Sequence, residues 1–133
     1  MRVAQKLYEG INLNKETSGL ITYMRTDGVQ ISQEAVTNIR EFISNEYGKN
    51  FIPESPRYYK SKAANAQEAH EAIRPTNFTY SPKLISKYLD KDQLKLYDLI
   101  WKRTLSSQMA SAELDKTTVD IKSKDNSITF RTN

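Results

Sequence analysis

The sequence predicts a mainly helical α+β fold with one short strand in its first quarter and a β-hairpin at its C-terminal end. Apolar residues recur every three or four positions in 1–11, 32–48 and 92–109, as on the buried face of a helix. Residues 20–24 are instead rich in β-branched and aromatic side chains, which favour a strand. After Thr117 the apolar residues alternate with polar ones, which is typical of a strand with one buried face.

The first half of the chain contains two predicted helices on either side of that short strand. Gly10 provides a C-terminal stop for the first helix, and residues 12–19 are polar and turn-forming. Ser32 is a favourable N-cap for the second helix, whose apolar face continues until Gly48. These start and stop residues set the expected bounds of both helices.

A long loop and a short helix are predicted next. Residues 51–66 contain two prolines, two adjacent tyrosines and several basic side chains without sustained periodicity, which indicates a loop. Residues 66–73 have the pattern of a short helix, which Pro75 closes because proline disfavours helical conformation in the residue before it.

The last part of the chain is predicted to hold two helices and the hairpin. Ser81-Pro82 combines an N-cap with a proline at the first helical position, and this helix should end near Asp90. Asp92 is the predicted cap of the longest helix, which should anchor the core. Residues 117–130 form the predicted hairpin, with a turn at 124–126.

Composition excludes several classes of site. The chain has 133 residues, no cysteine and one histidine, which excludes disulfides, thiolate zinc sites, cysteine nucleophiles and paired-histidine metal sites. No apolar run approaches the roughly 20 residues needed to span a bilayer, and the first residues lack a signal-type apolar centre. A cytoplasmic setting without a membrane partner is therefore expected. The net charge of +4 favours polyanions only mildly.

The first candidate site is formed by Tyr23 and Arg25 at the end of the predicted strand. A period of two places a phenol and a guanidinium on the same face. Arg25 could bind the non-bridging oxygens of a phosphodiester while Tyr23 attacks phosphorus. A free phenol has a pKa of about 10, so this role needs nearby positive charge or a proton acceptor. The same pattern also fits a half-buried tyrosine with an arginine at the rim of a sheet.

Two further groups of side chains could bind phosphates. His70 and Arg74 are four residues apart and could reach one phosphate from one helix face, although ion pairing with the neighbouring glutamates is an alternative. In the loop, Arg57, Lys60 and Lys62 are interleaved with two tyrosines, as in single-strand binders. A solvated loop remains the other interpretation.

Four segments together closely resemble the nucleophile-bearing domain of bacterial DNA topoisomerase I, a type IA enzyme. The match is strong because its motifs occur in the same order as in that family and extend over almost the whole chain. The segments are Ala4-Gln5-Lys6-Leu7-Tyr8-Glu9-Gly10, Gly19-Leu20-Ile21-Thr22-Tyr23-Met24-Arg25-Thr26-Asp27, Ala66-Gln67-Glu68-Ala69-His70-Glu71-Ala72-Ile73-Arg74-Pro75 and Leu96-Tyr97-Asp98-Leu99-Ile100-Trp101.

The resemblance implies roles for individual residues. Tyr23 would attack single-stranded DNA to give a 5′-phosphotyrosyl link, and Arg25 would hold the scissile phosphate. His70 would contact the DNA backbone, with Arg74 as a less direct helper. The parent protein would then be an isomerase that relaxes negatively supercoiled DNA without ATP, in the cytoplasm and in association with the nucleoid.

The resemblance also implies that this chain is one part of a larger enzyme. Residues 1–114 would be the mainly helical catalytic-tyrosine domain, and residues 115–133 would begin an adjacent β-rich hinge domain. Type IA enzymes bind Mg²⁺ through acidic residues of a separate domain, and no such cluster precedes Tyr23 here. The chain alone is therefore expected to cleave DNA inefficiently, because charge on the transferred phosphate and the leaving oxygen needs assistance.

Gly28 is a departure from the family, which commonly has serine after Arg-Thr-Asp. Loss of the hydroxyl could remove a hydrogen bond or a cap, and it is expected to alter tuning without abolishing activity. Tyr23 should be partly exposed, because the metal-binding domain expected to cover the site in the parent enzyme is not part of this chain. Full burial in the chain's own core would contradict a role as nucleophile.

Two other functions remain as alternatives. The first is a non-catalytic single-stranded DNA-binding module, in which the basic side chains of the loop together with His70 and Arg74 bind phosphates and Tyr58 or Tyr59 stacks on bases. The second is a purely structural helical domain, which would show no salt-sensitive DNA binding.

Overall fold

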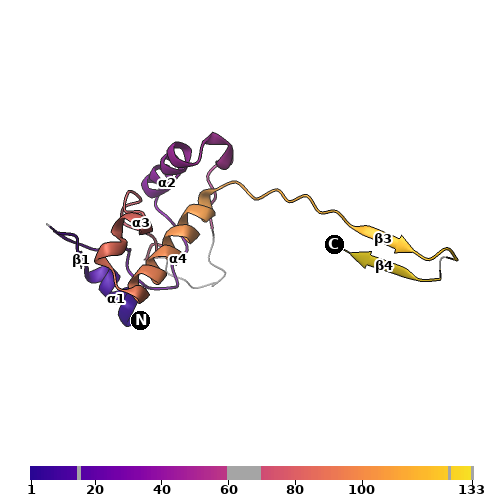
Figure 1. The fold of residues 1–133 in the computed structure, drawn as a ribbon. Helices are drawn as coiled ribbons and strands as arrows, with labels where there is room; N and C mark the ends of the chain where they lie inside the picture. Colours follow the sequence, from indigo (N-terminus) through magenta and orange to yellow (C-terminus); the bar gives the residue numbers. More distant parts are fainter. Residues whose placement is uncertain (15, 60–69, 126, 133) are drawn as a thin grey trace.

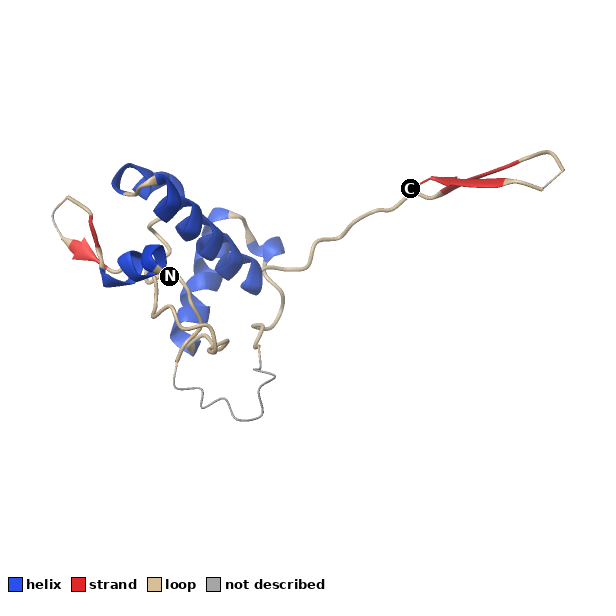
Figure 2. Ribbon diagram, turned by 90° about the horizontal axis from the view of Figure 1, so that it is seen from below, coloured by secondary structure: helices blue, strands red, loops and turns tan. Residues whose placement is uncertain are grey.

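The computed structural model describes residues 1–14, 16–59, 70–125 and 127–132 and confirms a mainly helical α+β fold. Figure 1 shows the helices gathered into one body, from which an extended segment leads to a separate hairpin. Figure 2 shows the same division from below. In chain order the elements are α1 (Arg2–Glu9), β1 (Ile11–Asn12), β2 (Thr17–Ser18), α2 (Gln33–Glu46), the 3₁₀ turn η1 (Lys49–Phe51), α3 (Pro82–Ile85), the 3₁₀ turn η2 (Ser86–Tyr88), α4 (Lys91–Gln108), β3 (Val119–Lys122) and β4 (Thr129–Thr132).

The core forms where α1, α2 and α3 each pack against α4. Most of its side chains belong to the predicted helices and to the apolar pair at 20–21. Phe78 is also buried although it lies in no predicted element, whereas Leu84, expected on the buried face of the helix that starts at Ser81-Pro82, is exposed. Tyr97 is completely buried in α4, and its hydroxyl donates a 2.8 Å hydrogen bond to the carbonyl oxygen of Tyr80. Burial raises the pKa of Tyr97, so this phenol stays a neutral donor at any ordinary pH. The fully or nearly fully buried apolar residues include Leu7, Leu20, Ile21, Val36, Ile39, Ile43, Ile85 and Leu105.

Both ends of α2 agree with the sequence prediction. The Ser32 side chain accepts a hydrogen bond from the amide of Ala35, and the helix ends before Gly48. The α4 cap differs, because Asp90 and not Asp92 occupies the N-cap. The Asp90 carboxylate accepts from the amides of Asp92 and Gln93, while the Gln93 side chain accepts from the Asp90 amide. This reciprocal capping box satisfies several amides that Asp92 could not reach from inside the helix.

Two other segments differ from the prediction. Residues 12–19 contain most of a small antiparallel hairpin, in which Ile11 pairs with Ser18 and Asn12 with Thr17. The predicted helix 66–73 is absent over its described part, residues 70–73. The amide of Ala72 donates to the carbonyl oxygen of Gln30 instead of forming a helical bond. Residues 66–69 lie outside the described residues.

The predicted C-terminal hairpin is present, formed by β3 and β4 in antiparallel register with Ile121 opposite Phe130. The buried face expected from its alternating pattern is absent, because Val119, Ile121, Ile128 and Phe130 are all exposed. Residues 110–118 form an exposed, irregular connection between α4 and β3, which Figure 1 shows as an extended segment. The predicted domain boundary at 114/115 falls inside this connection and stays a prediction.

We expect Asp90→Ala to lower the free energy of unfolding by about 1 kcal/mol, because it removes the side chain that caps α4. Asp92→Ala is the matched control and should change it by less than about 0.5 kcal/mol, since the loss of a favourable first-turn charge is offset by a better helix former. Urea unfolding followed by circular dichroism measures both, and an equal effect of the two substitutions would contradict the assigned cap.

Candidate active site

Two segments that are distant in sequence place Tyr23 at the surface. The amide of Thr22 donates to the carbonyl oxygen of Arg74 at 2.9 Å, and the amide of Thr76 donates to that of Leu20 at 3.1 Å. The amide of Leu20 also donates to the carbonyl oxygen of Leu7 at 2.7 Å. Leu20 and Ile21 are thereby buried, while Tyr23 emerges with 46% of its surface exposed, which confirms its expected partial exposure.

The strand predicted at 20–24 is shorter than expected and consists of one isolated bridge between Ile21 and Pro75. The ladder does not continue because the Thr22 hydroxyl replaces a backbone partner. This hydroxyl accepts from the amide of Arg74 at 2.9 Å and donates to the carbonyl oxygen of Ala72 at 2.8 Å. The bridge still fixes the backbone immediately before Tyr23.

The ring of Tyr23 lies between two other rings. His70 is 5.5 Å away between ring centroids, at a tilt of 47°. Tyr8 of α1 is 5.3 Å away, with an angle of 66° between the two ring planes. The Tyr23 hydroxyl makes no hydrogen bond to any described residue, so its oxygen is free to act on a ligand.

Arg25 contacts the same histidine. One terminal nitrogen of its guanidinium lies 3.3 Å from His70 Nε2, and its Nε pairs with the Asp27 carboxylate at 2.7 Å. Because arginine can only donate, a hydrogen bond here requires Nε2 to accept, which assigns the imidazole proton to Nδ1. The structure therefore brings Tyr23, Arg25 and His70 together, as the motifs predicted.

The guanidinium of Arg74 is bound to other protein groups, unlike that of an arginine that is free to bind phosphate. Its Nε and one terminal nitrogen donate to the two carboxylate oxygens of Glu71 at 2.8 and 2.9 Å, and its other terminal nitrogen donates to the carbonyl oxygen of Pro75. Glu71 also accepts from the amide of Ser32 at 2.8 Å. Burial raises the pKa of Glu71, but the bonds from Arg74 and Ser32 outweigh it and hold the pKa below its ordinary value. This pair ties the His70 segment to the start of α2.

Gly28 has a steric role in this structure. A Cβ at this position would clash with the carbonyl oxygen of His70 and would lie 2.9 Å from that of Glu71. The steric demand at residue 28 therefore adds to the loss of the serine hydroxyl expected from the sequence. A serine here would require the backbone at residues 70–71 to move away, because carbonyl oxygens of the main chain cannot rotate aside as a flexible side chain does.

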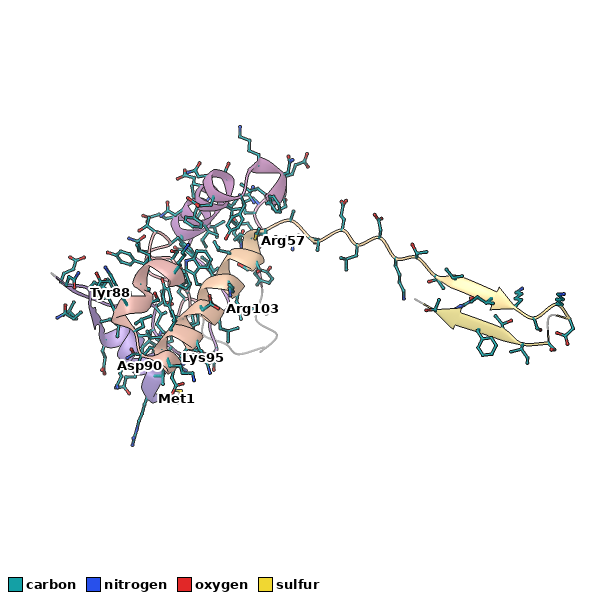
Figure 3. All side chains as sticks on the ribbon, viewed as in Figure 1. Met1, Arg57, Tyr88, Asp90, Lys95 and Arg103 are labelled. Carbon is teal, nitrogen blue, oxygen red and sulfur yellow. The ribbon has the colours of Figure 1, made fainter. Side chains whose placement is uncertain are left out.

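The basic loop is anchored to the end of α4. The fully buried Gln108 accepts from the amide of Arg57 at 3.2 Å and donates to its carbonyl oxygen at 2.9 Å. The Arg57 guanidinium donates to the Ser111 hydroxyl, and the Tyr59 hydroxyl donates to the carbonyl oxygen of Ser107. In Figure 3 Arg57 lies where the extended segment leaves α4. Tyr58 is exposed, while Lys60 and Lys62 lie outside the described residues.

Sequence reasoning did not assign roles to Tyr8, Glu71 or Gln108. The spacing of Glu71 and Arg74 is that of a helical ion pair, and this signal was available, although the pair forms outside a helix. Tyr8 and Gln108 act through contacts with residues far along the chain, which no local pattern reveals. Within the described ranges, no cluster of histidine and acidic side chains could hold a metal ion, and no helix has the length and apolarity to cross a membrane.

Comparison with known proteins shows to which family this chain belongs. A sequence profile described as DNA topoisomerase matches residues 1–133. The chain belongs to the DNA topoisomerase family. Similar proteins include DNA topoisomerase 1 of Rickettsia conorii, 56% identical over 93% of this chain and 16% of that protein. DNA topoisomerase 1 of Rickettsia bellii is 53% identical over the whole chain and 17% of that protein.

A topoisomerase from another bacterium and a solved structure are consistent with this family membership. DNA topoisomerase 1 of Campylobacter jejuni is 52% identical over 84% of this chain and 16% of that protein. Full-length topoisomerase I from Thermotoga maritima superposes with a TM-score of 0.75 and 37% identity, over 99% of this chain and 20% of that one. The chain thus spans about a sixth of the length of the curated topoisomerase relatives that it matches.

We expect Glu71→Gln to lower the free energy of unfolding by about 1–3 kcal/mol at neutral pH, because a partly buried Arg74 then loses its charged partner. The folded-state pKa of Glu71 is lowered, so its contribution is complete above the unfolded pKa and is lost as the pH falls through the folded one. The difference between wild type and variant should therefore be constant above about pH 6 and shrink in acid.

Urea unfolding at several pH values measures this difference. Asp98→Asn is the matched control, since it breaks the exposed Asp98–Lys102 pair and should cost only about 0.5 kcal/mol or less. A Glu71→Gln effect as small as the control, or one that grows in acid, would contradict the structural role of the Glu71–Arg74 pair.

Proposed function

We propose that this chain is the nucleophile-bearing part of a type IA DNA topoisomerase, with Tyr23 as the nucleophile. The observation that carries the proposal is the grouping of Tyr23, Arg25 and His70 at one exposed place, with a phenol hydroxyl that no described residue occupies. The topoisomerase relatives support an enzyme that acts on DNA strands.

The proposed reaction exchanges one phosphodiester for another. The Tyr23 oxygen forms a bond to phosphorus and loses its proton, while the bond from phosphorus to the 3′ oxygen breaks and that oxygen takes up a proton. The protein is left joined to the 5′ phosphate of a single strand. Because the bond broken and the bond formed are similar in energy, strand passage and religation need no ATP. The complete protein would in this way relax negatively supercoiled DNA.

Arg25 and His70 suit the phosphate that this reaction transfers. Asp27 fixes the guanidinium of Arg25 through its Nε, which leaves N–H groups on the terminal nitrogens for the non-bridging oxygens. These N–H groups would stabilise the negative charge that develops on the oxygens of the transferred phosphate. His70, which touches both Tyr23 and Arg25, would contact the same or the adjacent phosphate.

The other predicted DNA contacts divide into two groups. Arg57, whose guanidinium donates to Ser111, precedes the exposed Tyr58 in sequence and would bind a phosphate of the same strand further from Tyr23. Lys60 and Lys62 follow directly in sequence and are proposed for the same path. Arg74 would have to give up Glu71 to bind DNA, so we assign it to holding the segment of His70 instead.

Mg²⁺ belongs to the proposal only through other parts of the longer protein. The described residues contain no group of acidic side chains that fits the ion, so no step here is assigned to it. We place its ligands outside this chain, in keeping with relatives several times as long. On this proposal the chain alone would cleave inefficiently, and the complete protein would act in the cytoplasm at the nucleoid.

Replacement of Tyr23 by Phe tests the proposal in a full-length topoisomerase that contains this segment. The enzyme is incubated with Mg²⁺ and an end-labelled single-stranded oligonucleotide, denatured, and examined for label attached to protein. The covalent adduct should be lost, because the variant lacks the attacking oxygen, while affinity for the oligonucleotide should change by less than about threefold, since the ring remains.

Tyr47→Phe is the matched control, because Tyr47 is a similarly exposed tyrosine that packs on Phe51 at the end of α2. It should form the adduct as wild type does. An adduct that persists in Tyr23→Phe would place the nucleophile elsewhere. Binding without any adduct in the wild-type enzyme would favour the single-stranded DNA-binding module.

A further inference from the structure

Tyr8 lies beside the proposed nucleophile and has no assigned role. Its ring meets that of Tyr23 in an edge-on arrangement, on a different element from His70, so the Tyr23 ring has one aromatic neighbour from α1 and one from the segment that begins at residue 70. Building on the proposed function, we propose that Tyr8 is a positioning residue, which holds the Tyr23 ring in the orientation needed for attack.

The backbone gives this contact a rigid base. The last turn of α1 is anchored by the completely buried Leu7, whose carbonyl oxygen accepts from the amide of Leu20. Gly19 approaches the same turn so closely that a Cβ there would lie 2.6 Å from the carbonyl oxygen of Tyr8. The chain that leads to Tyr23 is therefore clamped against the helix that carries Tyr8, and the two rings have little freedom to separate.

The Tyr23 side chain needs such support because little else restrains it. The ring is half exposed and its hydroxyl forms no hydrogen bond to the described residues, so ring contacts decide where the oxygen points. An in-line displacement at phosphorus is sensitive to small misplacements of the attacking atom. An edge-on aromatic pair corresponds to about a twofold to tenfold change in an equilibrium or rate.

The ring of Tyr8, and not its hydroxyl, carries this role. Within the described residues the Tyr8 hydroxyl has no hydrogen-bond partner, whereas its ring makes the contact with Tyr23. Tyr8→Phe should therefore retain the function, while Tyr8→Leu keeps an apolar residue with good helix propensity but loses the aromatic edge.

The test compares Tyr8→Phe, Tyr8→Leu and Tyr47→Leu in a full-length topoisomerase that contains this segment. Single-turnover rates of adduct formation are measured with Mg²⁺ and a saturating end-labelled single-stranded oligonucleotide, together with the Kd for that oligonucleotide and the thermal midpoint. Tyr8→Leu should slow adduct formation about two- to tenfold with an unchanged Kd. Tyr8→Phe should match wild type, and so should Tyr47→Leu, which removes a similarly exposed aromatic side chain at the C-cap of α2.

Three results would overturn the positioning role. These are a wild-type rate for Tyr8→Leu, a rate for Tyr8→Phe as slow as that for Tyr8→Leu, and a Tyr8→Leu defect that also appears in Kd or in the thermal midpoint. An adduct formed by Tyr23→Phe would instead refute the proposed function. The failure of one proposal is thus distinguishable from the failure of the other.

Discussion

The candidate site depends on two segments of the chain that are fifty residues apart. The Thr22 hydroxyl joins them. It accepts from the amide of Arg74 and donates to the carbonyl oxygen of Ala72, in place of a regular strand pair. This arrangement stops the ladder one residue before Tyr23 and frees the following residues from the sheet geometry. The same crossing brings His70 to the side of Tyr23. A longer strand would instead have continued the pairing through Tyr23.

The site lies where the core ends. Leu20 and Ile21 are buried against the helices, and two residues later the phenol of Tyr23 is half exposed. The short distance along the chain places the backbone of Tyr23, the proposed nucleophile, next to the core, although its side chain faces solvent. On the other side, Glu71 joins the His70 segment to the amide of Ser32, so the first turn of α2 acts as a second anchor. Reactive side chains are thus exposed on rigid supports.

Much of the fold could be predicted from local chemistry, and most of the exceptions arise where contacts distant in sequence decide the structure. Apolar periodicity and caps identified the long helices because both signals act within a few residues. The predicted N-cap of α4 was wrong by two residues. Both Asp90 and Asp92 are suitable cap residues, and the reciprocal hydrogen bonds between Asp90 and Gln93 decide between them. The strand at 20–24 was overestimated, because its pairing stops after one bridge. The helix predicted at 66–73 is absent over its described residues 70–73, where the amide of Ala72 bonds to Gln30 instead. In the site, spacing and resemblance indicated Tyr23 and Arg25, but neither could show that Glu71 occupies Arg74.

The charged side chains around Tyr23 form two groups: those that hold chain segments together and those that stay available to a ligand. Glu71 neutralises Arg74 in a half-buried setting, where an unpaired guanidinium would be costly, and this pair has little capacity left for a ligand. Arg25 is paired with Asp27 through its Nε at the exposed surface, which leaves N–H groups on its terminal nitrogens. A phosphate, which carries charge and several acceptor oxygens, can therefore bind Arg25 without displacing Asp27, whereas it would have to displace Glu71 from Arg74. For the proposed function, this difference in burial and pairing favours Arg25 over Arg74 as the group that binds the transferred phosphate.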